Sequence, residues 1–172
     1  MERKDSPVER IERIKTTDDI EKITQVINQS FQTVAEEFGF TRQNAPTFPA
    51  FIEPEIIENQ IHEGLSLYCF IVDDIFVGSI GTSDLKDNDT FKIERLAVLP
   101  GYRHQGIGKR LMDYAYQKIT KNSGKIAQVE IVNENTKLKS WYTDNGFYEL
   151  RIDNYKQLPF TVCVLTKELE KW

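Results

Sequence analysis

A short segment with two glycines and two cations, residues 103–109 (RHQGIGK), stands directly before an amphipathic helical pattern. The first turn of a helix leaves backbone N–H groups without intrahelical partners and carries about half a positive charge. Gly106 and Gly108 let the backbone approach a bound group closely, and Arg103 and Lys109 add side-chain charge. The segment predicts a site for an anion such as a pyrophosphate; the alternative is an ordinary strand-to-helix connection.

Two common phosphate-binding motifs do not fit this segment. The dinucleotide pattern GxGxxG fails because Leu111 stands where the third glycine should be. A Walker A loop fails because no GK[ST] follows the glycines. The anion site is therefore expected to be of another kind.

A strand and a helix must hold the segment in place. The β-prone run that begins at Phe91 is expected to be the strand, and the residues after the glycines repeat apolar side chains at helical spacing. This apolar stripe consists of Ile107, Leu111, Met112, Ala115 and Ile119. Strand, turn and helix should form one rigid unit.

The other elements follow from periodicity and from Pro and Gly breaks. Thr17 or Asp18 is the expected cap of a long helix that stops at Gly39, and Pro54 opens a second helix. Further strands are predicted over residues 10–15, 67–72, 75–82, 126–132, 147–152 and 161–166, with a short helix over 136–144.

The element order βααβββαβαββ predicts an α/β (α+β) fold. We expect a single domain over residues 1–172, built on a mixed, mostly antiparallel sheet of about seven strands with about four flanking helices. The first nine residues are expected to be flexible.

Composition excludes several classes of protein. The 172 residues are 40% hydrophobic and 28% charged with a net charge of −5, which is ordinary for a globular domain and not for a nucleic-acid binder. No membrane span or signal peptide is apparent, so we expect a cytoplasmic protein without a membrane partner. Cys69 and Cys163 are expected to be buried, reduced thiols. The two histidines, His62 and His104, form no metal-ligand cluster, and no metal is expected.

A second pattern follows the glycine segment at a defined spacing. Asn135 is followed seven residues later by Tyr142 and then by Gly-Phe at 146–147. With residues 103–108, which match [QR]xxGx[GA], this pattern resembles the GCN5-related N-acetyltransferase (GNAT) superfamily. The resemblance is strong from residue 67 to 148 and loose elsewhere.

The resemblance implies acetyl-CoA as co-substrate. It also implies that the fourth strand splays from the fifth, that pantetheine inserts between them, and that the amide of Val98 or Leu96 faces the thioester carbonyl. The cofactor-binding residues that it implies are Leu96, Ala97, Val98, Arg103, His104, Gln105, Gly106, Ile107, Gly108, Lys109, Asn135 and Tyr142.

Glu94 is the candidate general base. A lysine-like amine has a pKa of about 10.4, so deprotonating it at pH 7 costs roughly 4.6 kcal/mol. Strand alternation places Lys92, Glu94, Leu96 and Val98 on one face, which in the family looks into the acceptor cleft. Glu94 would act through water; the alternative is a solvated carboxylate or one paired with Lys92.

Tyr142 matches the family tyrosine that hydrogen-bonds the departing sulfur as a general acid. A free tyrosine is a weaker acid than a thiol, so full proton transfer would be uphill by roughly 2 kcal/mol, and hydrogen bonding matters as much. The alternative is a tyrosine packed beside Trp141. Asn135 would contact the pantetheine arm or fix the turn, and Leu138 stands where relatives often have a small residue.

The sequence thus predicts an N-acetyltransferase that moves acetyl from acetyl-CoA to a primary amine of a small molecule or peptide by direct attack in a ternary complex. Two alternatives stay open: a non-catalytic acyl-CoA-binding sensor, and a protein lysine or N-terminal acetyltransferase. A homodimer is expected from the family. The acceptor is not encoded in any recognisable motif.

Overall fold

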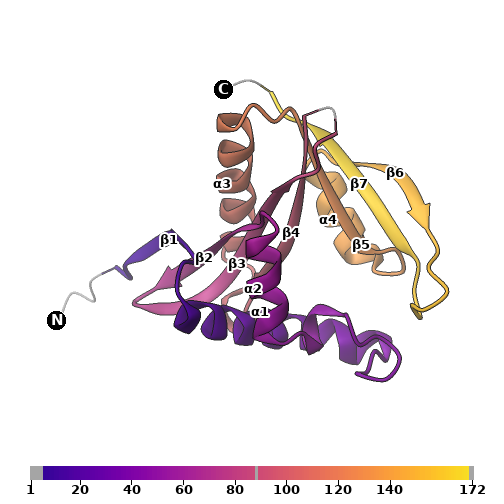
Figure 1. Ribbon diagram of the computed structural model, residues 1–172, viewed down its shortest axis with the longest axis horizontal. Coiled ribbons are helices and arrows are strands. Elements are labelled where there is room, and N and C mark those ends of the chain that lie inside the picture. The colour runs from indigo at the N-terminus through magenta and orange to yellow at the C-terminus, as the bar shows by residue number, and fades with distance from the viewer. Residues whose placement is uncertain (1–5, 88, 171–172) are drawn as a thin grey trace.

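The computed structural model describes residues 6–87 and 89–170, which form a seven-stranded sheet with helices on both faces (Figure 1). In chain order the elements are β1 (Glu9–Arg13), α1 (Thr17–Phe38), η1 (Pro49–Phe51), α2 (Pro54–His62), β2 (Ser66–Val72), β3 (Ile75–Asp84), β4 (Thr90–Val98), η2 (Pro100–Tyr102), α3 (Ile107–Lys121), β5 (Ile126–Val132), α4 (Thr136–Asp144), β6 (Tyr148–Asp153) and β7 (Val162–Glu168). Apart from the two short 3₁₀ helices, this order confirms the predicted one.

The sheet runs β1-β2-β3-β4-β5-β7-β6. Neighbours pair antiparallel except β4 and β5, which are parallel. The parallel pair needs a crossover, and α3 supplies it. The mixed, mostly antiparallel sheet that was predicted is confirmed.

The start of the chain differs from the prediction in two details. Thr16, not Thr17 or Asp18, caps α1: its Oγ1 accepts from the Asp19 amide at 3.1 Å, and the Asp19 carboxylate reaches back to the Thr16 amide. Glu9, counted among the nine flexible residues, is the first residue of β1 and pairs with Val72.

Two apolar clusters cover opposite faces of the sheet. On one face, α3 and α4 pack through side chains such as Leu111 and Tyr142 against Val129 of β5. On the other face, α1 and α2 pack through residues such as Ile27 and Ile57. The α1 and α2 helices cover the β1–β4 half of their face (Figure 1).

Strands β4 and β5 pair over three positions only. The pairs are Thr90 with Ile126, Phe91 with Ala127 and Lys92 with Gln128. Beyond them the two strands diverge, as Figure 1 shows, while β4 stays paired with β3 as far as Val98. One edge of β4 is therefore open along its second half.

A β-bulge interrupts β4 at the start of this open stretch. Ser79 faces Ala97 and Gly81 faces Glu94, so Arg95 and Leu96 together oppose the single residue Ile80. Arg95 has a left-handed φ of 56°. An extra residue reverses the side-chain alternation beyond it.

Candidate active site

Helix α3 begins without a side-chain cap. Gly106 is its N-cap residue with a left-handed φ of 79°, and a Cβ there would meet no atom within 4 Å. The first amide that bonds within the helix is that of Arg110, which donates to the Gly106 carbonyl at 3.1 Å. The amides of Ile107, Gly108 and Lys109 have no intrahelical acceptor. They form a set of free donors at the positive end of the helix dipole.

The charges around this helix start favour an anion. The first turn has no acidic residue, although acidic residues are the usual choice at this position. Lys109 is exposed, and its Nζ lies 3.7 Å from Asp113 Oδ2 one turn later. Such exposed pairs are weak, so Lys109 is able to turn toward a bound anion. His104 and Gln105 border the same site with exposed side chains.

The Arg103 side chain is engaged by acceptors within the protein. Its Nε donates to the Val98 carbonyl at 3.0 Å, Nη1 to Thr33 Oγ1 at 3.1 Å, and Nη2 to the Ser30 carbonyl at 2.6 Å. The guanidinium therefore ties α1 to the end of β4. A contact between the Arg103 side chain and the anion stays a prediction, and the guanidinium already donates to these three neutral acceptors.

The end of β4 presents backbone groups to the gap. The Leu99 amide donates to the Val77 carbonyl of β3 at 2.9 Å, so by alternation the amides of Val98 and Leu96 point away from β3, toward β5. Ala97 faces the other way: a Cβ on Gly78 would lie 2.9 Å from the Ala97 carbonyl oxygen. An extended ligand can pair with this free edge as an added strand.

The bulge divides the side chains that were predicted to share one face. Leu96 and Val98 pack against the α3 and α4 cluster, as does Ile93. Glu94, opposite Gly81, lies on the α1 and α2 face. The prediction of one face for Lys92, Glu94, Leu96 and Val98 is therefore wrong beyond Glu94, because a bulge cannot be read from the residue pattern.

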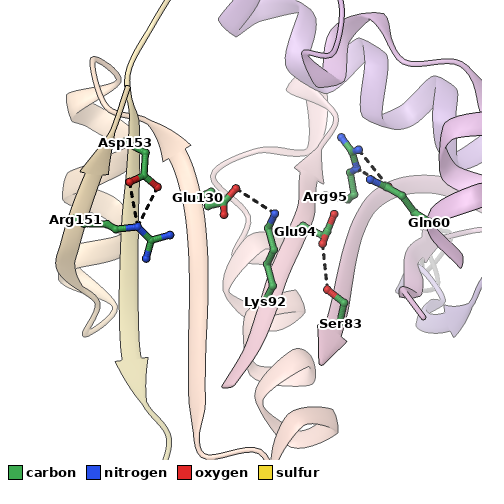
Figure 2. Close-up of polar contacts among 8 residues, drawn as sticks. All are labelled: Gln60, Ser83, Lys92, Glu94, Arg95, Glu130, Arg151 and Asp153. Carbon is green, nitrogen blue, oxygen red and sulfur yellow. Dashed lines mark hydrogen bonds and ion pairs between the residues drawn. The ribbon is translucent and has the colours of Figure 1, made fainter. Parts of the chain in front are cut away.

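Glu94 has a polar neighbour other than the one considered from the sequence. Its Oε2 accepts from Ser83 Oγ at 3.2 Å (Figure 2). Lys92 instead bonds Glu130 of β5 at 3.1 Å. A carboxylate with one hydroxyl donor keeps lone pairs for a further proton. The alternative of a pair between Glu94 and Lys92 is wrong.

Asn135 is the N-cap residue of α4. Its Oδ1 accepts from the Leu138 amide at 3.2 Å, so Asn135 fixes the turn into the helix. Leu138 is partly buried and packs on the α3 and α4 cluster. A contact between Asn135 and pantetheine stays a prediction.

Tyr142 is 5% exposed and packs edge-to-face between two aromatic rings. Its ring centroid lies 5.0 Å from that of Trp141 and 5.3 Å from that of Phe147. Burial raises the pKa of Tyr142 above the ordinary value, and neighbouring Tyr116 adds to this. The hydroxyl therefore stays protonated around neutral pH and is available as a donor of a proton or of a hydrogen bond.

Three side chains near the site were not foreseen as part of it. Trp141 links the two helices, because its Cζ2 lies 3.7 Å from where a Cβ on Gly108 would be. The Tyr116 hydroxyl is buried and has no hydrogen-bond partner in the described part of the chain; its position on the buried stripe of α3 was the available signal. For Arg95, in the bulge, the sequence held no signal.

Two classes of feature are absent from residues 6–87 and 89–170. No helix there is long and apolar enough to cross a membrane. No group of three or more His, Cys, Asp or Glu side chains is placed to hold a metal ion.

Comparisons with known proteins agree with this arrangement. Residues 24–157 match the family model of the acetyltransferase (GNAT) domain, whereas no curated protein matches the chain. Similar solved structures include the ribosomal-protein-S18-alanine N-acetyltransferase of Escherichia coli, which is 15% identical with 95% of both chains covered and a TM-score of 0.74. The PaiA N-acetyltransferase of Thermoplasma acidophilum, in complex with coenzyme A, is 19% identical, with 94% of this chain and 99% of that chain covered and a TM-score of 0.71.

A GNAT-family acetyltransferase of Staphylococcus aureus Mu50 is 22% identical, with 95% of this chain and 100% of that chain covered and a TM-score of 0.72. At these identities the structures share the fold, and the family itself is shown by the family model, which spans most of the chain. This chain belongs to the GNAT family and is an acetyl-CoA-dependent acetyltransferase.

Proposed function

We propose that this enzyme transfers the acetyl group of acetyl-CoA to a primary amine of a small molecule or peptide, by direct attack in a ternary complex. One observation carries the proposal: the uncapped start of α3 lies beside the open edge of β4, because a Cβ on Gly108 would be 4.0 Å from Val98 Cγ2. A pyrophosphate and an extended arm need these two features next to each other. The similar PaiA structure contains coenzyme A.

The backbone of residues 103–109 holds the pyrophosphate in this proposal. Pantetheine lies along Leu96, Ala97 and Val98 in the gap between β4 and β5. The amide of Val98 or Leu96 donates to the thioester carbonyl and stabilises the oxyanion that forms when the amine attacks.

In the acyl transfer the amine nitrogen bonds the thioester carbon, and the carbon–sulfur bond then breaks. Glu94 takes a proton from the amine through water, and Tyr142 donates to the departing sulfur. Because burial raises the pKa of Tyr142, transfer of its proton to a thiolate is less favourable than for a free tyrosine. Tyr142 therefore stabilises the thiolate mainly by a hydrogen bond.

A coupled pair of measurements tests the function. Calorimetry measures acetyl-CoA binding, and thiol detection measures CoA release with a panel of small amines and of peptides. Turnover on at least one amine, dependent on acetyl-CoA, is the expected result. Tight binding of acetyl-CoA without turnover on any amine or peptide would instead identify a sensor, and turnover on peptides alone would identify a protein acetyltransferase.

A homodimer and a cytoplasmic location stay predictions. Strand β6 is an outer strand of the sheet and exposes Tyr148, Leu150 and Ile152, which makes it the surface on which to test for a dimer. Sedimentation of Leu150→Lys beside the wild type measures whether this surface forms the dimer.

Both cysteines are free and buried, as expected for reduced thiols.

A further inference from the structure

The bulge of β4 places two consecutive charged residues, Glu94 and Arg95, on the same face of the sheet. Glu94 lies opposite Gly81, where an added Cβ would meet Leu65 of the α1 and α2 cluster. Arg95 reaches Gln60 on α2. In a regular strand, neighbouring side chains point to opposite faces. The face away from the phosphate-binding helix therefore carries a carboxylate and a guanidinium side by side.

The backbone of Arg95 has a conformation that arginine rarely adopts. Its φ of 56° lies in the left-handed region, which glycine, asparagine and aspartate adopt more readily than arginine does. Strained residues of this kind cluster at binding and catalytic sites. Glycine would form a bulge with a purely structural role more easily. The arginine at this position therefore indicates a function for its side chain.

The Arg95 guanidinium is partly buried without a carboxylate partner. Its Nε and Nη2 both donate to one neutral oxygen, Gln60 Oε1, at 3.2 and 3.1 Å (Figure 2). Burial lowers the pKa of Arg95, although the charge of Glu94 acts in the opposite direction. No ion pair among the described residues includes Arg95, whereas the other two cations in Figure 2, Lys92 and Arg151, each have a carboxylate within 3.1 Å.

The partly buried guanidinium has a neutral amide as its only hydrogen-bond partner among the described residues, and the charge of Glu94 beside it is not in an ion pair with it. The Gln60 oxygen holds one edge of the guanidinium, and the Nη1 group donates to no described residue. A guanidinium fork matches a carboxylate in geometry as well as in charge. The chemistry that completes this site is an anion of that shape.

We propose that Arg95, aligned by Gln60, binds a carboxylate of the acceptor, so that the preferred acceptors are amines that also carry a carboxylate. The inference rests on the proposed function and names its class of acceptor. With the carboxylate on Arg95, the amine of the acceptor lies beside Glu94, the proposed base.

Matched pairs of acceptors test this preference. The panel contains glycine, β-alanine, 4-aminobutyrate, 6-aminohexanoate and several dipeptides, each beside its own carboxamide, with CoA release as the readout. For the acid of best length, the wild-type kcat/KM should exceed that of the carboxamide by about 10- to 100-fold, mostly through KM.

Three variants separate binding from structure. Arg95→Met should remove the preference, so that the kcat/KM for acids falls toward that for the matching carboxamides. Arg95→Lys keeps the positive charge but loses the paired N–H donors of the guanidinium, so it should retain part of the preference for acids over carboxamides. Gln60→Met removes the alignment but leaves the cation, so it should weaken the preference without abolishing it.

Different outcomes would overturn the proposed class of acceptor and the proposed acetyltransferase function. Equal wild-type activity on acids and carboxamides overturns the inference and leaves the proposed function intact. Equal losses on both acceptor types in Arg95→Met also overturn it, because they assign Arg95 to holding α2 against β4. Absence of turnover on every amine overturns the proposed function, and the inference with it.

Discussion

Tyr142→Phe gives the sharpest test of the acyl-transfer site. The substitution removes one oxygen atom and keeps the ring, with its edge-to-face contacts to Trp141 and Phe147. The unfolding temperature should therefore change little. What is lost is the hydroxyl donor of a side chain that is 5% exposed.

The expected loss of kcat depends on whether Tyr142 transfers its proton or only donates a hydrogen bond, and the direction of its pKa shift decides between the two. General acid catalysis by complete proton transfer contributes about 10²- to 10⁴-fold to the rate. A hydrogen bond to a charged group contributes about 1.5–3 kcal/mol, which corresponds to about 10- to 150-fold. Because burial raises the pKa of Tyr142, the hydrogen-bond role applies, and we expect kcat to fall by about 10- to 150-fold with acetyl-CoA affinity nearly unchanged.

Thiol detection suits this measurement because the cysteines of the protein contribute little background. Cys69 and Cys163 are both buried, and burial raises the pKa of Cys69 to about 11. The matched control is Tyr116→Phe, which removes a neighbouring buried hydroxyl that has no partner in the described residues. This control should keep kcat and gain about 1 kcal/mol in unfolding free energy.

Two results would refute the reasoning. A kcat of Tyr142→Phe within twofold of the wild type would remove the donor role. Equal losses of kcat in the Tyr142 and Tyr116 variants would show that the packing of this aromatic cluster matters, and not the hydrogen bond to sulfur.

Variants at three further positions test the other parts of the site. Gly108→Asp should abolish acetyl-CoA binding in calorimetry, because it places a negative charge at the helix start; Gly108→Ala should keep the fold, since its Cβ would make only ordinary contacts, and unchanged affinity in the Asp variant would contradict the site. Arg103→Ala should lower the unfolding free energy by about 2 kcal/mol through its lost hydrogen bonds, while acetyl-CoA affinity stays within about twofold. A large loss of affinity with unchanged stability would show instead that the guanidinium contacts the pyrophosphate. Glu94→Gln should lower kcat/KM at pH 7 by about 10²-fold and recover as rising pH deprotonates the amine itself, whereas a loss that is the same at every pH would exclude a base role.

The uncapped start of α3, where we propose the phosphate binds, could be predicted from the sequence because its signal is local. The segment of residues 103–109 and the stripe of α3 depend on neighbours within two turns, and the structure places Gly106 at the helix start as expected. The spacing from Asn135 to Tyr142 is local in the same sense, because both belong to α4 and its cap.

The faces of β4 could not be predicted, because they depend on the register with β3. Alternation of side chains assumes an uninterrupted strand, but two residues of β4 oppose Ile80.

The contacts of side chains with partners distant in sequence could not be predicted either. Arg103 was assigned to the nearby anion site, yet it bonds α1 about 70 residues away, since its acceptors come together only in the folded chain.

The sequence by itself determined the element order, the family and the glycine-marked start of α3, because periodicity, caps and glycine spacing act over a few residues. The tertiary structure alone decided which side chains of β4 share a face. Strand pairing created the bulge, and the bulge turned Glu94 and Arg95 to one side and Leu96 and Val98 to the other. Contacts between segments distant in sequence fix these orientations, and no local pattern records them.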